Sequence, residues 1–344
     1  MAISQATSPQ TTVTVGQAPP AVAVSRQPRD LQRTAQLGLA TVWLLDAVLQ
    51  IQPFMFTPGS NGFSGMIGGT AAGNPAWIEH TITWNASIVN HHPVLTNTAF
   101  ALIQFIIAFG IVGRRTCKAA LGLSIVWAVG VWWFGEGLGE VFAGNGTPFG
   151  GGPGGVLFYA VLAVLLWPAT GPDGPFVAAR SVGARAARAI WAAVWGVLAL
   201  LAVVGSGLSA QALNGIVSGM ASSQPGWLAH LDRYSAALLL HHGTALAISL
   251  CVFCGMVAVS AYLPVTWAKV AIVLVIAAFG FVWVAVQNFG GILAGGATDP
   301  NSGLLVILLA LIYWPLTQVR APRGDGLEAQ NSARLVDIRG GCAS

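Results

Sequence analysis

Residues 89–113, VNHHPVLTNTAFALIQFIIAFGIVG, form a long apolar run that a pair of arginines follows directly. A helix needs about 20 mostly apolar residues to cross the ~30 Å hydrocarbon layer of a bilayer, and this stretch meets that requirement. Its polar members Asn90, Asn97 and Gln104 recur at intervals of seven and share one side of the helix. We therefore expect a membrane-spanning helix with one polar stripe.

Other segments of the chain approach the same length and apolarity. The composition agrees with them, because the 344 residues are 55% hydrophobic and only 8% charged, with a mean hydropathy of +0.71. In lipid every backbone polar group needs a partner within the protein, which favours helices. The sequence thus predicts an all-α integral membrane protein with eight transmembrane helices, at about 37–56, 89–113, 119–142, 155–170, 188–210, 234–262, 266–287 and 303–317.

The basic residues predict the orientation. Those before the first span, after the last span and between the second and third, fourth and fifth, and sixth and seventh spans all fall on one side of the membrane. The other side has loops without Lys or Arg, at 57–80, 143–154, 211–229 and 289–302. Because Lys and Arg are retained in the cytoplasm, we expect a multi-pass plasma-membrane protein with both termini cytoplasmic. The net charge of +4 reflects this topology and predicts no nucleic-acid partner.

Matches between the halves of the chain indicate an internal repeat. Pro75-Ala-Trp77 matches Pro225-Gly-Trp227 at an offset of 150, and an offset of 151 relates Trp132 to Trp283, Glu136 to Gln287, and Gly139 to Gly290. Units with an even number of spans enter the membrane in the same direction. We therefore expect a parallel tandem duplication of a four-helix unit. Its predicted parts are a disordered tail 1–35, repeats 36–170 and 188–317, a cytoplasmic linker 171–187, and a tail 318–344.

All six histidines belong to the repeated element, and they suggest a ligand site near the outer leaflet. Imidazole and carboxylate are ligands for transition metals, and facing histidines can ligate a haem iron. The candidate metal ligands are His80, His91, His92, Glu136 and Glu140, and the candidate cofactor-binding residues are His91, His92, His241 and His242. A structural role as interfacial anchors or hydrogen-bonding groups is the competing interpretation.

Ionisable and amide side chains inside the bilayer are costly, so they mark candidate sites of function. Those expected on a proton path or around the metal are Asp46, Gln50, Asn97 and Gln104. The halves are unequal here, because the second half has Gln287 where the first has Glu136. An active site is therefore expected in the first half.

Residues 43–56, WLLDAVLQIQPFMF, and 132–140, WWFGEGLGE, resemble a family of multi-pass membrane proteins from high-GC actinobacteria that has no assigned activity. The resemblance covers about 36–317 and implies membrane localisation without a mechanism. A looser likeness to four-helix DoxX-type quinone-linked membrane proteins concerns the helix count and the Gly- and Leu-rich first span.

The sequence leaves several functions open. The first is a metal- or haem-binding membrane redox protein with a His/Glu site, exchanging electrons with a lipid-soluble quinone. The second is a proton- or cation-coupled transporter of a small solute or metal, with a path lined by Asp46, Asn97, Gln104 and Glu136. The third is a non-catalytic subunit of a membrane complex or oligomer.

Overall fold

The computed structural model describes residues 28–169, 174–221 and 224–316, and these residues form helices, turns and loops without a β-strand. This confirms the all-α prediction. Among the described residues, five helices are long and apolar enough to cross a membrane. They are α4 (Pro93–Val112), α5 (Cys117–Phe134), α8 (Ala184–Val203), α10 (Gly226–Ser260) and α11 (Val265–Ala285).

The helix α4 turns its polar side inward and its apolar side outward. Asn97 and Gln104 are buried, whereas Leu95 and Leu102 are 71% and 57% exposed. In water such a helix would bury its apolar side and expose its polar side, because exposed apolar surface is unfavourable there. The arrangement is that of a helix whose outer side faces lipid. It confirms the inward position of Asn97 and Gln104 from the expected polar stripe, whereas Asn90 is exposed and belongs to α3.

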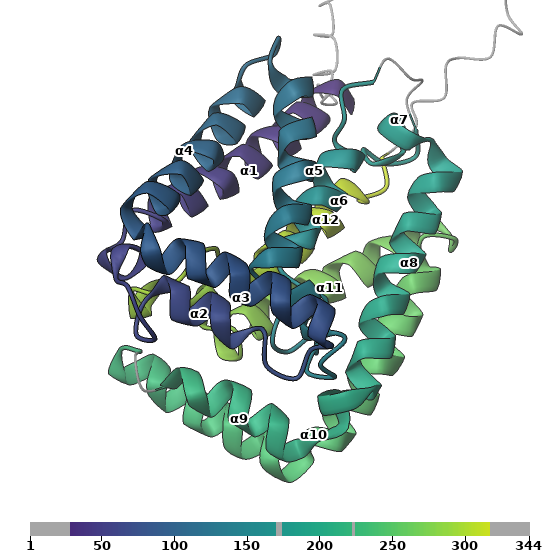
Figure 1. Cartoon of the computed structure of the whole chain (residues 1–344). Coiled ribbons are helices and arrows are strands. Elements are labelled where there is room, and N and C mark those ends of the chain that lie inside the picture. The colour runs from purple at the N-terminus through teal and green to yellow at the C-terminus, as the bar shows by residue number, and fades with distance from the viewer. Residues whose placement is uncertain (1–27, 170–173, 222–223, 317–344) are drawn as a thin grey trace, which may run out of the picture.

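Some pairs of packed helices recur in the two halves of the chain, although α3 and α4 of the first half correspond to the single helix α10 of the second (Figure 1). α1 packs on α4 as α8 packs on α10, and α5 packs on α6 as α11 packs on α12. α2 packs on α3, and α9 packs on the first part of α10, as a hydrogen bond from Asn214 to the carbonyl of Ala236 illustrates. The bounds of the other helices are α1 (Pro28–Leu49), α2 (Phe63–Gly69), α3 (Ala76–His91), α6 (Leu157–Leu165), α7 (Ala179–Val182), α9 (Ala210–Met220) and α12 (Asn301–Ile312), with short 3-10 turns Pro53–Phe56, Gly137–Glu140, Gly205–Leu208 and Asn288–Ala294.

The start of α1 and the ends of α4, α6 and α12 lie at one end of the molecule. The guanidinium of Arg33 donates to the carbonyls of Ile111 and Val112, which end α4 and lack partners within that helix. The amide of Gln36 donates to the carbonyl of Leu166 after α6. Ala178 N–H, just before α7, donates to the carbonyl of Ile312. Arg33 therefore lies at the end of the molecule where α4, α6 and α12 end.

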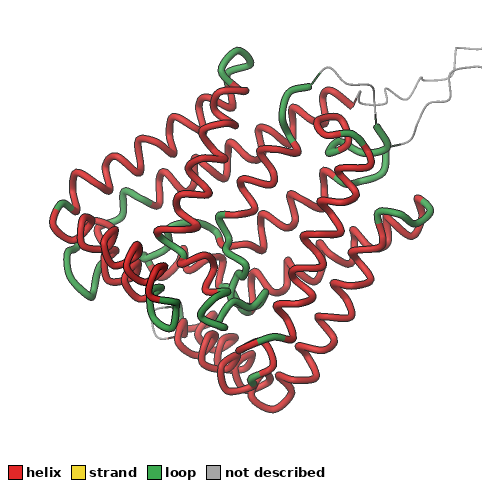
Figure 2. Tube along the Cα trace, turned by 45° about the vertical axis from the view of Figure 1, so that its right-hand side comes forward, coloured by secondary structure: helices red, strands yellow, loops and turns green. Residues whose placement is uncertain are grey.

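Two of the predicted spans are much shorter than expected. α6 has 9 residues and α12 has 12, so at about 1.5 Å per residue they are roughly 14 Å and 18 Å long, against ~30 Å of hydrocarbon. The predictions of full spans at 155–170 and 303–317 are thus not matched by helices of spanning length. The loops before α6 and α12 fold inside the helical body instead (Figure 2). Irregular backbone is tolerated at such depth only where protein or a cavity surrounds it.

Several predicted boundaries also change. The predicted loops 57–80 and 211–229 contain α2, the start of α3 and α9, because these amphipathic segments pack on the long helices. The predicted span 89–113 is interrupted at His92, where Pro93 begins α4. Proline favours the first turn of a helix because its missing N–H would be unpaired there in any case.

The predicted tails and linker are only partly described. Residues 28–35 of the predicted tail 1–35 form the first turns of α1, and α7 and the start of α8 lie in the predicted linker 171–187. Residues 1–27 and the predicted tail 318–344 lie outside the described residues.

The loops before α6 and α12 are held by the same contacts in the two halves. The indole of Trp132 donates to the carbonyl of Pro153 at 2.6 Å, and the indole of Trp283 donates to that of Pro300 at 2.7 Å. Gly139 and Gly290 have φ angles of +64° and +76°, which side-chain-bearing residues rarely adopt. Each loop thus needs glycine after the long helix and a tryptophan that fastens the chain returning toward the short one.

We expect Gly139→Ala to destabilise the protein by more than about 1 kcal/mol, the usual consequence of a side chain at an incompatible φ. A Cβ at this position would also lie 1.9 Å from the Pro153 carbonyl oxygen. Thermal unfolding of the detergent-purified protein, followed by tryptophan fluorescence, measures the effect. Gly196→Ala on α8 is the control, because nothing lies within 4 Å of its Cβ position. Equal unfolding temperatures for the two variants would contradict the prediction.

Candidate functional site

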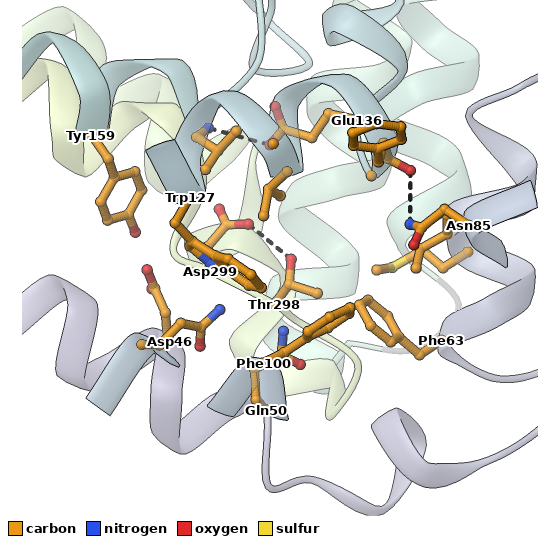
Figure 3. A pocket seen from close by; sticks show the side chains of 18 of the residues that line it. Asp46, Gln50, Phe63, Asn85, Phe100, Trp127, Glu136, Tyr159, Thr298 and Asp299 are labelled. Carbon is orange, nitrogen blue, oxygen red and sulfur yellow. Dashed lines mark hydrogen bonds between the residues drawn. The ribbon is translucent and has the colours of Figure 1, made fainter. Parts of the chain in front are cut away.

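A cavity of about 270 Å³ lies among helices α1 to α6 and the loop before α12 (Figure 3). Three carboxyl side chains line it: Asp46 from α1, Glu136 from the loop after α5, and Asp299 from the loop before α12. The hydroxyl of Tyr159 on α6 points toward the carboxyl group of Asp46 (Figure 3). The second half of the chain therefore contributes a carboxyl group to a cavity formed mainly by the first.

The rest of the wall combines aromatic, aliphatic and amide side chains and carries no positive charge. No Lys, Arg or His lines the cavity among the described residues. The aromatic side chains include Trp43, Phe63, Phe100, Trp127 and Tyr159. Acids beside aromatic rings, without a basic partner, form a wall that attracts cations.

Several polar atoms of this wall have no hydrogen-bond partner in the described structure. They are Asp46 Oδ1, Gln50 Oε1, Gln104 Oε1 and Glu136 Oε2. Buried polar groups are nearly always paired, so a concentration of unpaired ones around a cavity indicates a place for water or a polar ligand. The cavity is therefore the candidate functional site.

Hydrogen bonds fix α1 against its neighbours beside this site. The indole of Trp43 donates to Ser124 Oγ on α5 at 3.0 Å. The side-chain amide of Asn97 on α4 donates to the carbonyl of Gln50 at 2.6 Å, just beyond the end of α1. These contacts hold Asp46 and Gln50 in place, and they give Asn97 a structural role outside the cavity wall.

Asp299 is held by its own loop. Its carboxyl oxygens accept from the hydroxyl of Thr298 at 2.8 Å and from the backbone N–H of Asn301 at 2.7 Å. Asn301 begins α12, and the N-terminus of a helix stabilises negative charge. Burial nevertheless raises the pKa of Asp299 above its ordinary value, and the two hydrogen bonds oppose that rise.

Glu136 lies in the loop after α5, beyond the spanning helix. Its Oε1 accepts from the backbone N–H of Val156 at 3.2 Å, while Oε2 has no partner. Burial, reinforced by the negative charge of Asp299, raises the pKa of Glu136 from 4.5 to about 8. A carboxyl group of this kind exchanges its proton near neutral pH, which suits proton transfer.

The second half of the chain has a neutral side chain at the position that matches Glu136 in the sequence. Gln287 stands where the first half has Glu136, and its Oε1 accepts from the N–H of Gly303 at 3.0 Å as Glu136 accepts from Val156. Its amide nitrogen donates to Ser302 Oγ at 3.0 Å. The loop can therefore be held by a neutral amide, so the fold does not require the carboxyl group of Glu136.

We expect Glu136→Gln to stabilise the protein at pH 8 and to leave its stability unchanged at pH 5. Between pH 4.5 and about 8 the folded chain keeps a proton on Glu136 that the unfolded chain has lost. Stability therefore falls as the pH rises through this window, and glutamine removes that loss. Unfolding temperatures at the two pH values test this, with Glu79→Gln, at an exposed position of α3, as control. A shift of the same size at both pH values would argue against a raised pKa.

A second cavity of about 310 Å³ adjoins the first through shared residues. Glu136 and Asp299 line both cavities. The second is otherwise lined by Glu140 and by the glycine-rich loop, including Gly150, Gly151 and Gly152. The two carboxyl groups thus stand between an aromatic chamber and a glycine-lined chamber.

The histidines do not gather as expected. His80, His91, His92, His230, His241 and His242 are all exposed. Nδ1 of His91 lies 2.7 Å from the carbonyl of Ser87, and Nδ1 of His241 lies 3.0 Å from that of Ala237, each one turn back in its own helix. In the part of the chain that the structure describes, no three His, Cys, Asp or Glu side chains are placed to hold a metal ion. The described residues therefore give the predicted metal or haem site no support.

The break between α3 and α4 explains this outcome. His91 ends α3 and His92 separates it from α4, so the two rings lie at a surface corner between helices. Glu136 is instead carried into the interior by the loop after α5, and Glu140 lines the second cavity. The predicted ligands thus lie on different parts of the molecule.

Most of the polar residues predicted to line a path lie around one cavity. Asp46, Gln50, Gln104 and Glu136 all line the first cavity. Sequence reasoning missed Tyr159 and Asp299. A signal existed for Asp299, which stands before Pro300 at the start of a helix and in a loop without Lys or Arg.

No protein-family model, curated protein or solved structure matches the chain. The resemblance to an actinobacterial membrane family therefore stays a prediction. The fold and the site define a class of protein. In the part that the structure describes, the chain is all-helical, with five helices of membrane-spanning length and composition. It also has a buried cavity lined by carboxyl groups and aromatic rings.

Proposed function

We infer that the protein is a proton-coupled transporter of a small organic cation. The observation that carries this inference is the cavity in which Asp46, Glu136 and Asp299 meet aromatic rings without a basic residue among the described lining. Intramembrane carboxyl groups that face an internal cavity are typical of ion and proton pathways.

The chemistry of the wall favours an organic cation over a bare metal ion. Aromatic faces such as those of Trp43 and Trp127 attract ammonium groups, and carboxylates neutralise their charge. A cavity of about 270 Å³ is far larger than one ion needs. An amine or quaternary ammonium compound with a small apolar body fits both the space and the mixed surface.

Coupling to protons follows from the state of Glu136. With a pKa of about 8 it holds a proton at neutral pH when the cavity is empty. A bound cation favours the charged carboxylate and therefore expels that proton. Cation and proton compete for one group, which is the requirement for exchanging one against the other across a membrane.

The architecture supports alternating access by two like halves. The recurring pairs of packed helices, the matched tryptophan–proline contacts and the paired glycines support a parallel duplication. Helices that stop within the body, such as α6 and α12, are typical of transporter binding sites. In this proposal the membrane is the plasma membrane, and the end where Arg33 lies faces the cytoplasm.

Transport is tested with the purified protein in liposomes under an imposed pH gradient. The probes are a quaternary ammonium, a linear polyamine and an aromatic amine, chosen as classes that fit the wall. We expect at least one to accumulate against its gradient and to quench tryptophan fluorescence through Trp43 and Trp127. If none binds or accumulates, the proposal fails.

The same preparation separates transport from the other two functions. Metal analysis and an absorption spectrum would reveal stoichiometric iron, copper or haem in a redox protein. A non-catalytic subunit would copurify with a partner and would show no flux of any probe.

A further inference from the structure

A third cavity, of about 570 Å³, lies at the end of the molecule where α12 ends. It is bounded by α8, the end of α10, the start of α11 and the chain after α12. Arg188 and Lys269 line it, and no carboxyl group does so among the described residues. The cavity is therefore positively charged.

Each of the two cations lies over a neutral aromatic ring. The guanidinium carbon of Arg188 lies 5.9 Å from the centroid of the Tyr262 ring, and Nζ of Lys269 lies 5.7 Å from that of Trp314. Nε of Arg188 is buried and has no hydrogen-bond partner in the described structure. Ring contacts leave the N–H donors free to bind an anion. An unpaired buried donor such as Nε of Arg188 indicates that an acceptor binds there.

The first half uses its arginine differently. Arg33 near the start of α1 donates to the carbonyls that end α4. In the second half the indole of Trp191 on α8 donates to the carbonyl of Val257 near the end of α10. Because Trp191 already donates to this carbonyl, Arg188 is not needed as its donor, and its side chain lines the cavity instead.

The residues around the cavity indicate which kind of anion fits it. Phe176, Trp191 and Tyr313 give it an aromatic wall. Leu263 and Val265 at its margin are 47% and 56% exposed, as expected of residues in contact with lipid. Arg188 and Lys269 each lie about one turn inside their helices, near the level of lipid headgroups.

We propose that this cavity binds the phosphate of an anionic phospholipid headgroup. Arg188 and Lys269 hold the phosphate oxygens through charge-assisted hydrogen bonds, while the glycerol and upper acyl chain lie on the aromatic wall and the apolar margin. The site is separate from the carboxyl-lined cavity, so its test bears on neither proton coupling nor cation transport.

Native mass spectrometry of the full chain, titrated with phosphatidylglycerol or phosphatidylcholine, measures the binding. We expect phosphatidylglycerol to bind and Arg188→Gln with Lys269→Gln to weaken it about 30-fold, which is about 2 kcal/mol for two basic residues. The matched control is Arg114→Gln with Lys118→Gln, which removes the same charge from exposed positions at the same end of the first half. Equal losses in the two double variants would overturn the proposal.

Two further arms separate the ligand source from a folding defect. Arg188→Lys with Lys269→Arg keeps the charge, so it should keep the preference for phosphatidylglycerol; loss of that preference would overturn a charge-based site. Millimolar inorganic phosphate should leave the bound lipid in place. Displacement of the lipid would assign the cavity to a soluble phosphate and would overturn the lipid proposal.

Discussion

Replacing Asp46 by asparagine should reduce cation uptake about 100-fold, because removing one partner of a buried ionic contact costs about 2–5 kcal/mol of binding. Asp46 lines the cavity together with Glu136 and Asp299, and Asp46 Oδ1 has no partner within the described structure. Asparagine keeps the size of the side chain and can meet the Tyr159 hydroxyl. The variant should therefore fold and lack only the charge.

Uptake into liposomes and quenching of tryptophan fluorescence measure this loss separately as flux and as binding. Asp30→Asn is the matched control, since Asp30 is exposed in the first turn of the same helix α1. We expect wild-type uptake from the control. If Asp46→Asn transports as well as Asp30→Asn, the cavity is not the transport site.

The affinity for the cation should fall about 50-fold between pH 8 and pH 6. With a pKa of about 8, Glu136 is half ionised at pH 8 and almost wholly protonated at pH 6. The cation needs the ionised form, so below the pKa its apparent affinity falls about tenfold for each pH unit. In Glu136→Gln this pH dependence should disappear, and binding should be weak at both pH values.

Fluorescence titrations at the two pH values test this, and Glu79→Gln should keep the wild-type slope. If the cation affinity of Glu136→Gln still depends on pH, the exchanged proton belongs to Asp46 or Asp299, the other acids of the cavity. Proton release on cation binding, followed in weakly buffered solution, gives an independent measure of the same exchange.

The difference between Glu136 and Gln287 explains why the ionisable site occurs in only one half of the chain. Gln287 satisfies its loop with hydrogen bonds, whereas Glu136 leaves one oxygen unpaired and stays protonated at neutral pH. An ionisable group in place of a satisfied amide costs stability progressively as the pH rises from 4.5 to about 8. Functional sites commonly carry such a cost, which is why the stability of Glu136→Gln and its transport should change in opposite directions.

The fold was predictable where a local property decides it. The stretch 89–113 is apolar enough to reveal a spanning helix, and the period of its polar residues reveals the inward side of α4. Hydropathy did not reveal that 155–170 forms a helix of only 9 residues. An apolar segment buried by neighbouring loops has the same composition as one that crosses the whole bilayer.

The candidate site was predictable in part. Asp46, Gln50, Gln104 and Glu136 stand out because polar side chains in apolar helices are costly and need a reason. The histidines stand out for their chemistry and their repetition, yet the corner between α3 and α4 leaves them at the surface. Residue type and repeat position carry no information on which side of such a corner a ring will face.

The composition and the hydropathy pattern were enough to predict a helical chain that is apolar enough for a membrane, with its basic residues on one side. Each of these properties depends on residues close together along the chain. Only the tertiary structure decided which acids share a cavity, because Asp46, Glu136 and Asp299 come from three distant segments. They meet where two loops, fastened by Trp132 and Trp283, fold back among the helices, and no spacing in the sequence encodes that meeting.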